Sequence, residues 1–397
     1  MGMHFGAKTY DVSSMYPSMS IVHNISSETI NCECCKTDPE AKILPEVMEE
    51  INKELEVPRP RGTYWICKRW RGKFSEIMED LLQRKEQYKT HGLTLKEKAL
   101  KLFMNSGYGT FGQVYFKYYD PRVAELITGF ARHTLDSLVK FVNDNGGKIL
   151  FGDTDSIFVA ENNNDDAIDI ISEAKERFNV KLVRDRLWKI LFLTSNKKQY
   201  VGLTNQGNVV DKGLVGKKNN QPVYFNEVIS YLIDQKVVEI FVNEGPKLAI
   251  SRMLDYIREV YQTLDEKVSR DHDLEFIYDK LAYSAKSSKA LYDFKQNGWQ
   301  KDIYNEICAD SGGTVELAKS KSAANLVYRF WKVQNQIGAK GITVTMHPES
   351  HMLNIRKYKE ELWTCVKPLL EAYGLDKNEL STFENEMMKT QNTFQSS

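Results

Sequence analysis

The sequence lacks the features of a membrane-anchored or disulfide-stabilised protein. No apolar run approaches the roughly 20 residues that a membrane-spanning helix needs, and the chain has only six cysteines among 397 residues. Six cysteines in a chain of this size are too few for a disulfide framework, which favours a reducing compartment. We therefore expect a soluble protein with no membrane partner, and the sequence leaves its organism and exact location open.

An excess of charge of one sign is also missing. Lys and Arg together number 54, and so do Asp and Glu, so the net charge gives no indication of a nucleic-acid partner. The basic residues are nevertheless concentrated in two stretches, at 59–101 and 181–218. Local basic surfaces on a neutral chain suit a protein that binds a phosphate backbone and also releases it. A solvated charged face is the alternative for either stretch taken alone.

Four of the cysteines could in principle gather around zinc or an iron–sulfur cluster: Cys32, Cys34, Cys35 and Cys67. Their CxCC spacing lacks the paired CxxC of zinc knuckles, and Cys67 is alone in its part of the sequence. We therefore expect free thiols, with a metal site as the alternative.

The chain is too long for one compact core, so we expect two or three subdomains. Apolar periodicity predicts a strand before Asp11, a helix from about Tyr16 and an irregular segment over 31–72,. Further helices are expected over 74–89, after Thr94 as the cap residue, over 122–144 and over 167–177,. Strands are expected over 181–193 and 199–203, and long helices from 226 onward,. His91 and Gly92 are expected to make the turn before Thr94. This order favours an α+β protein with a small antiparallel sheet.

Three short stretches carry residues suited to chemistry on phosphates. They are DVSSMYPS at 11–18, KLFMNSGYG at 101–109 and GDTDS at 152–156. The first and third place carboxylates beside β-type runs, while the second is a basic segment of helical periodicity. Two acidic strand ends and a lysine-bearing helix are the parts needed for two-metal transfer of a phosphoryl group from a nucleoside triphosphate.

These stretches resemble, in order, motifs A (DxxSLYPS), B (KxxxNSxYG) and C (YGDTDS) of the family B DNA polymerases, and the run at 24–30 resembles NISPETI of phage members. The resemblance covers nearly the whole chain, most strongly up to about residue 225. It implies the right-hand polymerase fold, with a small antiparallel palm sheet, helical fingers and a helical thumb. The expected division is palm (1–34), fingers with a connecting segment (35–108), palm (109–225) and thumb (226–397).

The resemblance also implies the ligands of two Mg²⁺ ions, or of Mn²⁺ in their place. They are the carboxylates of Asp11 and Asp155 and the backbone carbonyl of Val12. Asp153 is expected to support the catalytic site, with a turn-stabilising aspartate as the alternative. Lys101 would neutralise charge on the leaving pyrophosphate and could protonate it.

The nucleotide-binding residues implied by the family are Ser14, Tyr16, Arg84, Lys85, Lys101 and Asn105. Lys101 and Asn105 are four residues apart, hence on one helix face. Tyr16 would pack under the deoxyribose and exclude a 2′-hydroxyl by collision. Tyr88 departs from the family, because a second triphosphate-binding lysine would stand there; Lys85 or Lys89 could replace it.

The DNA-binding residues implied by the family are Tyr108, Gly109, Lys197, Lys198, Tyr200, Lys212, Gly213, Lys217 and Lys218. The run at 197–200 resembles the KKRY element that follows the primer strand, with Gln199 in place of Arg. The run at 212–218 resembles KGxxxxRR, with Lys for Arg. Since lysine binds phosphate as a point charge, we expect looser and more salt-sensitive binding.

The function implied is template-directed DNA synthesis from dNTPs on a primer–template. Asp11 has only ten residues before it, so we expect the chain to lack the exonuclease and N-terminal domains. We also expect it to work with a separate half or with accessory proteins such as a clamp. The alternative is a non-catalytic DNA-binding subunit of polymerase fold in a replication complex. That alternative predicts loss of Asp11, Lys101 or Asp155, and all three are present.

Overall fold

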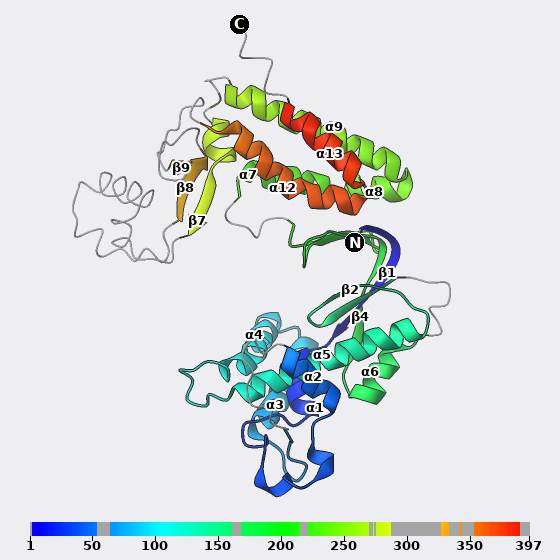
Figure 1. The fold of residues 1–397 in the computed structure, drawn as a ribbon, viewed down its shortest axis with the longest axis vertical. Helices are drawn as coiled ribbons and strands as arrows, with labels where there is room; N and C mark the ends of the chain where they lie inside the picture. The colour runs from blue at the N-terminus through cyan, green and yellow to red at the C-terminus, as the bar shows by residue number, and fades with distance from the viewer. Residues whose placement is uncertain are drawn as a thin grey trace, which may run out of the picture. The chain divides into compact units, whose positions relative to one another are not determined.

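The computed structural model describes residues 2–53, 64–160, 168–214, 221–269, 273, 275–286, 327–332, 342–343 and 353–389. These residues form two compact units, whose elements are labelled in Figure 1. The motif unit is Ala7–Leu187, and the terminal unit is Met1–Gly6 with Trp188–Ser397. Each unit has its own apolar core. Within the described parts of the chain, none of the helices is long and apolar enough to cross a membrane.

Antiparallel strands bring the first and third motifs together in the motif unit. They are β1 (Gly2–Val12), β2 (Ile149–Asp153) and β3 (Ser156–Ala160), in the order β2–β3–β1. Ser156 of β3 is the register partner of Asp11 on one side and of Asp153 on the other. Residues in register project their side chains to the same face. The sheet therefore brings motif A and motif C to one edge although they are far apart in sequence.

The motif unit also contains helices α1 (Met15–Val22), α2 (Pro45–Lys53), α3 (Lys73–Thr90), α4 (Thr94–Thr110), α5 (Pro121–Asp144) and α6 (Ile170–Phe178), with short 3₁₀ turns η1 (Glu33–Cys35) and η2 (Pro39–Ala41). Asp120 caps α5 by accepting a hydrogen bond from the backbone N–H of Arg122, and Pro121 occupies the first turn,. Both α3 and α5 pack against α1. The helix that follows motif A is thereby fixed from two sides.

The terminal unit combines strands with long helices. Antiparallel strands β4 (Leu182–Leu193), β5 (Tyr200–Thr204) and β6 (Val209–Lys212) are consecutive neighbours, and β4 belongs to the terminal unit from Trp188 onward. The other elements are α7 (Val223–Leu232), α8 (Gln235–Asn243), α9 (Pro246–Ser269), the π-helix η4 (Phe276–Lys280), β7 (Tyr283–Lys286), β8 (Val327–Lys332), β9 (Ile342–Thr343), α12 (Ile355–Tyr373) and α13 (Lys377–Lys389). Buried Lys359 of α12 forms an ion pair of 2.5 Å with Asp265 of α9, so these two helices are joined by charge as well as by apolar packing.

Most expected elements are present, and two details differ. Thr94 is the first residue of α4 and not its cap; Leu93 occupies that position without a capping side chain, and the backbone N–H of Thr94 bonds to the Gly92 carbonyl. Strands β6 to β9 were not expected, because they are short and lack a long alternating pattern. The structure also places Cys67 beside the other three cysteines, although it stands alone in its part of the sequence. The mixed helical and antiparallel architecture agrees with the α+β prediction.

Candidate active site

Asp11 and Asp155 are held at one edge of the sheet by a backbone hydrogen bond. The N–H of Val12 donates to the carbonyl of Asp155 at 2.8 Å, and the N–H of Ser13 donates to the carbonyl of Lys181 at 2.9 Å. Val12 is fully buried. Burial and paired hydrogen bonds fix the register of the strand end, because a shift of one residue would expose Val12. The two aspartates are therefore adjacent for structural reasons.

The turn that presents Asp155 has a restricted backbone. Thr154 has a φ of 57°, which is uncommon for a β-branched residue and indicates that the surrounding structure enforces it. Its hydroxyl donates to the Asp153 carboxylate at 3.0 Å, and the N–H of Asp155 donates to the Asp153 carbonyl at 2.6 Å. Asp153 is buried. These contacts stabilise the turn, and a role of Asp153 in supporting the catalytic site remains a prediction.

The donor atoms at this edge suit a hard cation such as Mg²⁺, which prefers oxygen ligands. The side-chain oxygens of the three aspartates do not converge as a three-ligand group; among the described residues only the four cysteines do so. An ion at this edge would therefore take its remaining ligands from backbone, water and phosphate oxygens, as Mg²⁺ in phosphoryl-transfer sites does.

Lys85 and Arg84 are neighbours on α3 and point in different directions. Lys85 is buried, and its ammonium group donates to the hydroxyl of Ser14 at 2.9 Å. Burial lowers the pKa of Lys85, and the positive charge of Lys101 also lowers it. Arg84 is exposed and paired with Asp80, with 2.9 Å between Nε and a carboxylate oxygen. Lys85 therefore faces motif A, while Arg84 faces solvent.

The second helix of the pair, α4, presents Lys101 and Asn105. Both side chains are exposed, and their spacing of four residues places them on one face. Lys96, also on α4, lies over the ring of Tyr88 with its ammonium 5.6 Å from the ring centroid. This cation–π contact brings a cation to the position where the family motif would have a lysine. Sequence reasoning proposed Lys85 or Lys89 there and missed Lys96, since the contact joins two helices.

Tyr16 and Tyr108 bring motifs A and B together. Their ring centroids are 4.5 Å apart, and the planes are inclined by 39°. Burial, together with the neighbouring Tyr16, raises the pKa of Tyr108 to about 12, so its hydroxyl stays protonated at neutral pH. A Cβ added at Gly109 would meet no atom within 4 Å. The protein itself therefore does not require glycine at this position.

An exposed aromatic segment follows motif B. Tyr115 is 97% exposed, and Val114 and Tyr118 are also largely exposed. The ammonium group of Lys117 lies 5.6 Å from the ring centroid of Tyr118. Aromatic rings beside a lysine are typical of surfaces that bind single-stranded nucleic acid. Sequence reasoning missed this segment, although the run YFKYY at 115–119 was a visible signal.

In the terminal unit, the expected DNA-binding residues gather around the turn between β4 and β5. Lys197 and Lys198 are exposed in this turn. Gly213 has a φ of 75°, and a Cβ there would lie 2.6 Å from the carbonyl oxygen of Lys198. Only glycine allows this close approach of two backbone segments. We call this arrangement the basic turn.

Tyr200 belongs to the interior of the terminal unit. It is only 4% exposed and is the register partner of Lys212, whose ammonium lies 5.9 Å from the centroid of the Tyr200 ring. The buried ring of Tyr200 therefore packs against the side chain of Lys212 and holds its ammonium group in position. Lys217 and Lys218 lie outside the residues that the structure describes.

Comparisons with known proteins identify the class of fold. The structure is similar to that of the family B DNA polymerase from Pyrobaculum calidifontis, with a TM-score of 0.60 and 22% identity over 95% of this chain and 46% of that one. The family model described as DNA polymerase family B matches residues 7–314. The chain belongs to DNA polymerase family B.

Curated relatives give the same family. The chain is 27% identical to DNA polymerase 1 of Saccharolobus solfataricus over 96% of its own length and 41% of the relative's. It is 25% identical to DNA polymerase 1 of Aeropyrum pernix over 96% and 37%. The chain thus spans about two fifths of the length of these relatives. Both are archaeal, and the expected likeness to phage members remains a prediction.

Proposed function

We propose that this chain performs template-directed DNA synthesis, transferring a nucleotide from a dNTP to the 3′-hydroxyl of a primer. The observation that carries the proposal is the hydrogen bond of 2.8 Å from the N–H of Val12 to the carbonyl of Asp155, which holds two carboxylates at one sheet edge in a family B chain. In the reaction, the 3′-oxygen bonds to the α-phosphorus, and the bond to the bridging oxygen of the β-phosphate breaks. Pyrophosphate leaves, and the proton of the 3′-hydroxyl passes to solvent.

In this proposal, Asp11, Asp155 and the carbonyl of Val12 would hold two divalent ions, Mg²⁺ or Mn²⁺. Such ions would supply electrostatic stabilisation of the attacking and leaving oxygens. The role of Asp153 is to position the turn, because its carboxylate and carbonyl accept hydrogen bonds from Thr154 and Asp155. The oxygen donors at this edge match the preference of these cations.

The triphosphate would be bound by the α3–α4 pair. Lys101 and Asn105 share an exposed face of α4 and are proposed to contact it directly, with Lys101 as the cation nearest the leaving pyrophosphate,. Lys85 is a positioning residue, because its ammonium group already bonds to Ser14. Arg84 would exchange Asp80 for a phosphate, and Lys96 would take part beside Tyr88.

The sugar and the DNA would contact the remaining motif residues. Tyr16 is proposed to lie under the deoxyribose, supported from the side by Tyr108. The open space above Gly109 leaves room for the backbone to approach the nascent base pair. The exposed rings of Tyr115 and Tyr118 are proposed to stack on unpaired bases,.

The basic turn is proposed to bind the primer-strand phosphates through Lys197, Lys198 and Lys212, with Lys217 and Lys218 extending it. Tyr200 would act through Lys212, because its own ring is buried. We further propose that 1–34 and 109–225 form the palm, 35–108 the fingers with their connecting segment, and 226–397 the thumb of a right-hand fold.

Primer extension tests the proposal. The purified 397-residue chain is incubated with a primer–template, dNTPs and Mg²⁺, and product length is read on a sequencing gel. We expect extension that depends on the template and the divalent ion. Binding of the same DNA without extension under any divalent ion would instead favour the non-catalytic subunit.

A further inference from the structure

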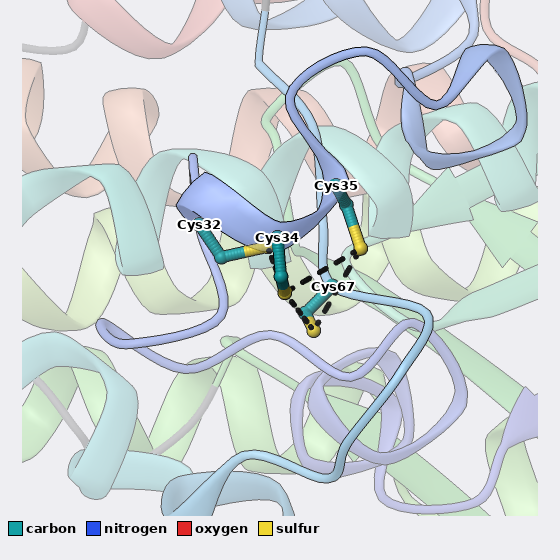
Figure 2. Close-up of side chains that lie close together, drawn as sticks. All are labelled: Cys32, Cys34, Cys35 and Cys67. Carbon is teal, nitrogen blue, oxygen red and sulfur yellow. Dashed lines mark hydrogen bonds between the residues drawn. The ribbon is translucent and has the colours of Figure 1, made fainter.

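Four cysteine thiols from two separate segments meet in the motif unit, away from the residues proposed to catalyse synthesis (Figure 2). Cys32, Cys34 and Cys35 come from the 3₁₀ turn η1 and the residue before it, and Cys67 comes from an extended segment more than thirty residues later. All four sulfur atoms lie within 4.8 Å of one another. Cys35 and Cys67 are buried, while Cys32 and Cys34 are partly exposed.

Backbone and side-chain contacts fix the two segments against each other. The indole N–H of Trp65 donates to the carbonyl of Cys32 at 2.8 Å, and the N–H of Asn31 donates to the carbonyl of Trp65 at 2.9 Å. The N–H of Cys67 donates to the carbonyl of Thr29 at 2.9 Å. The thiols are therefore held by a network that does not involve the sulfur atoms.

Four of the six sulfur–sulfur distances match the edges of one tetrahedron, and the other two are at most 4.8 Å. The Sγ of Cys34 lies 3.5 Å from that of Cys32, 3.8 Å from that of Cys35 and 3.6 Å from that of Cys67, and the last two are 4.0 Å apart. A tetrahedral zinc ion with bonds of about 2.3 Å to sulfur requires sulfur atoms about 3.8 Å apart. We propose that Cys32, Cys34, Cys35 and Cys67 bind a single zinc-type divalent cation, independently of the proposed polymerase chemistry.

The same distances argue against a disulfide and against an iron–sulfur cluster, the two other structures that clustered thiols form. A disulfide needs sulfur atoms about 2.05 Å apart, whereas the sulfur atoms of Cys32 and Cys34 are separated by 3.5 Å. In a [4Fe–4S] cluster each of the four thiolates bonds its own iron atom, and in a [2Fe–2S] cluster two thiolates bond each iron. In both, the four sulfur atoms would have to stand farther apart than around one ion. The geometry therefore selects a mononuclear site over the iron–sulfur alternative.

The surroundings of the thiols supply the second set of contacts expected of a metal site. The backbone beside two of the thiols is fixed, because the indole N–H of Trp65 donates to the carbonyl of Cys32 and the N–H of Cys67 donates to the carbonyl of Thr29. Hydrogen bonds around metal ligands orient them. Lys68 and Arg69, which directly follow Cys67, add positive charge beside the four thiolates.

The site is structural, because four protein ligands leave no open position on a tetrahedral ion. It lies at the base of α3. The Asn24 side chain donates to the carbonyls of Cys67 and Trp70, at 3.0 and 2.9 Å, and accepts from the N–H of Gly72 at 2.8 Å. Gly72 is the cap residue of α3. A bound ion would therefore anchor the helix that carries Lys85.

Metal analysis of the untagged full chain tests the site. After equilibration with limiting zinc and removal of loosely bound ions, elemental analysis is expected to give one zinc per chain. Substitution with Co²⁺ should give the intense visible absorption of a tetrahedral thiolate site. Iron with acid-labile sulfide would overturn the mononuclear assignment. A metal-free chain in which Cys32, Cys34, Cys35 and Cys67 are all reactive, or in which two of them form a disulfide, would overturn the site altogether.

Two variants and a control locate the metal. Cys34→Ser and Cys67→Ser should each reduce bound zinc from one per chain to near zero. Cys365→Ser should retain it, because Cys365 lies in the terminal unit beside Gln221. If a variant fails to fold, thiol modification of the wild-type chain provides the test, since one zinc should be released as four thiols react. Unchanged zinc in a soluble Cys34→Ser chain, or release that does not follow these thiols, would refute the proposal.

Discussion

The motif unit holds two groups of potential metal ligands that differ in kind. The carboxylates of Asp11 and Asp155 lie at strand ends and present oxygen atoms that leave room for water and phosphate. The four thiols come from irregular segments and enclose one point with soft ligands. An open oxygen site suits Mg²⁺ and a reacting substrate, whereas a closed sulfur site suits a structural ion. In these two proposals, one unit would use different metals for catalysis and for stability.

The sharpest test of this comparison is Asp155→Asn. Loss of a proposed ligand should lower the rate of primer extension by at least 100-fold, since even groups behind the ligands cost about 10–100-fold. DNA affinity and thermal stability should change little. Rates are measured under single-turnover conditions, with Asp255→Asn, an exposed aspartate of α9, as the control for loss of one charge. Equal extension rates in the two variants would show that Asp155 is not a ligand of the catalytic metal ions.

Selective metal removal separates the two sites. Chelation of Mg²⁺ should abolish extension reversibly and leave the melting temperature nearly unchanged. Extraction of a thiol-bound ion should instead destabilise the motif unit by about 3 kcal/mol or more, because binding energy at a structural site is folding energy. Differential scanning calorimetry and primer extension on the same samples distinguish the effects. If thiol-directed extraction left the melting transition in place, the sulfur site would have no structural role.

Tyr16→Ala tests the sugar contact beside the carboxylate edge. Removing the ring should raise the rNTP/dNTP ratio of kcat/KM by about 10-fold or more, because it removes a steric collision worth more than about 1 kcal/mol. Tyr16→Phe keeps the ring and should keep the ratio. If the alanine variant lost both activities in proportion, Tyr16 would be a packing partner of Tyr108 and nothing more.

Gly213→Ala tests the basic turn. A Cβ at Gly213 would collide with the carbonyl of Lys198, whereas at Gly207, which also has a positive φ, it would meet nothing within 4 Å. Both substitutions cost backbone strain, but only Gly213→Ala should displace Lys198 and weaken binding to primer–template DNA, by roughly 3- to 10-fold if one phosphate contact is lost. Fluorescence anisotropy over a salt series provides the measurement. Equal weakening in both variants would show that strain alone is responsible.

Gly109→Ala should change stability least of these substitutions, and it should change stability and primer extension in opposite directions. Alanine is favoured over glycine inside a helix by about 0.8–1 kcal/mol, and Cβ has open space here, so stability should rise slightly. Extension should fall if the nascent base pair approaches this backbone. An alanine variant that is both more stable and fully active would place the base pair elsewhere.

Much of the local structure could be predicted because it is encoded by neighbouring residues. The strand before Asp11, the α3–α4 pair and the turn at Gly92 each follow from short-range patterns of apolar spacing and turn chemistry. The cap of α4 was mispredicted because Thr94 is a good capping residue in isolation. The backbone of the preceding turn satisfied that helix end instead.

The family, the three motifs and the residue types suited to the chemistry could be identified from the sequence, because motif A, B and C residues have fixed local spacing. Which of these residues meet depends on tertiary packing. The burial of Lys85 against Ser14, the placement of Lys96 over Tyr88 and the burial of Tyr200 depend on packing between elements. The cysteines show the reason most clearly. Cys67 joins the other three through hydrogen bonds between distant segments, and spacing along the chain carries no information about such contacts.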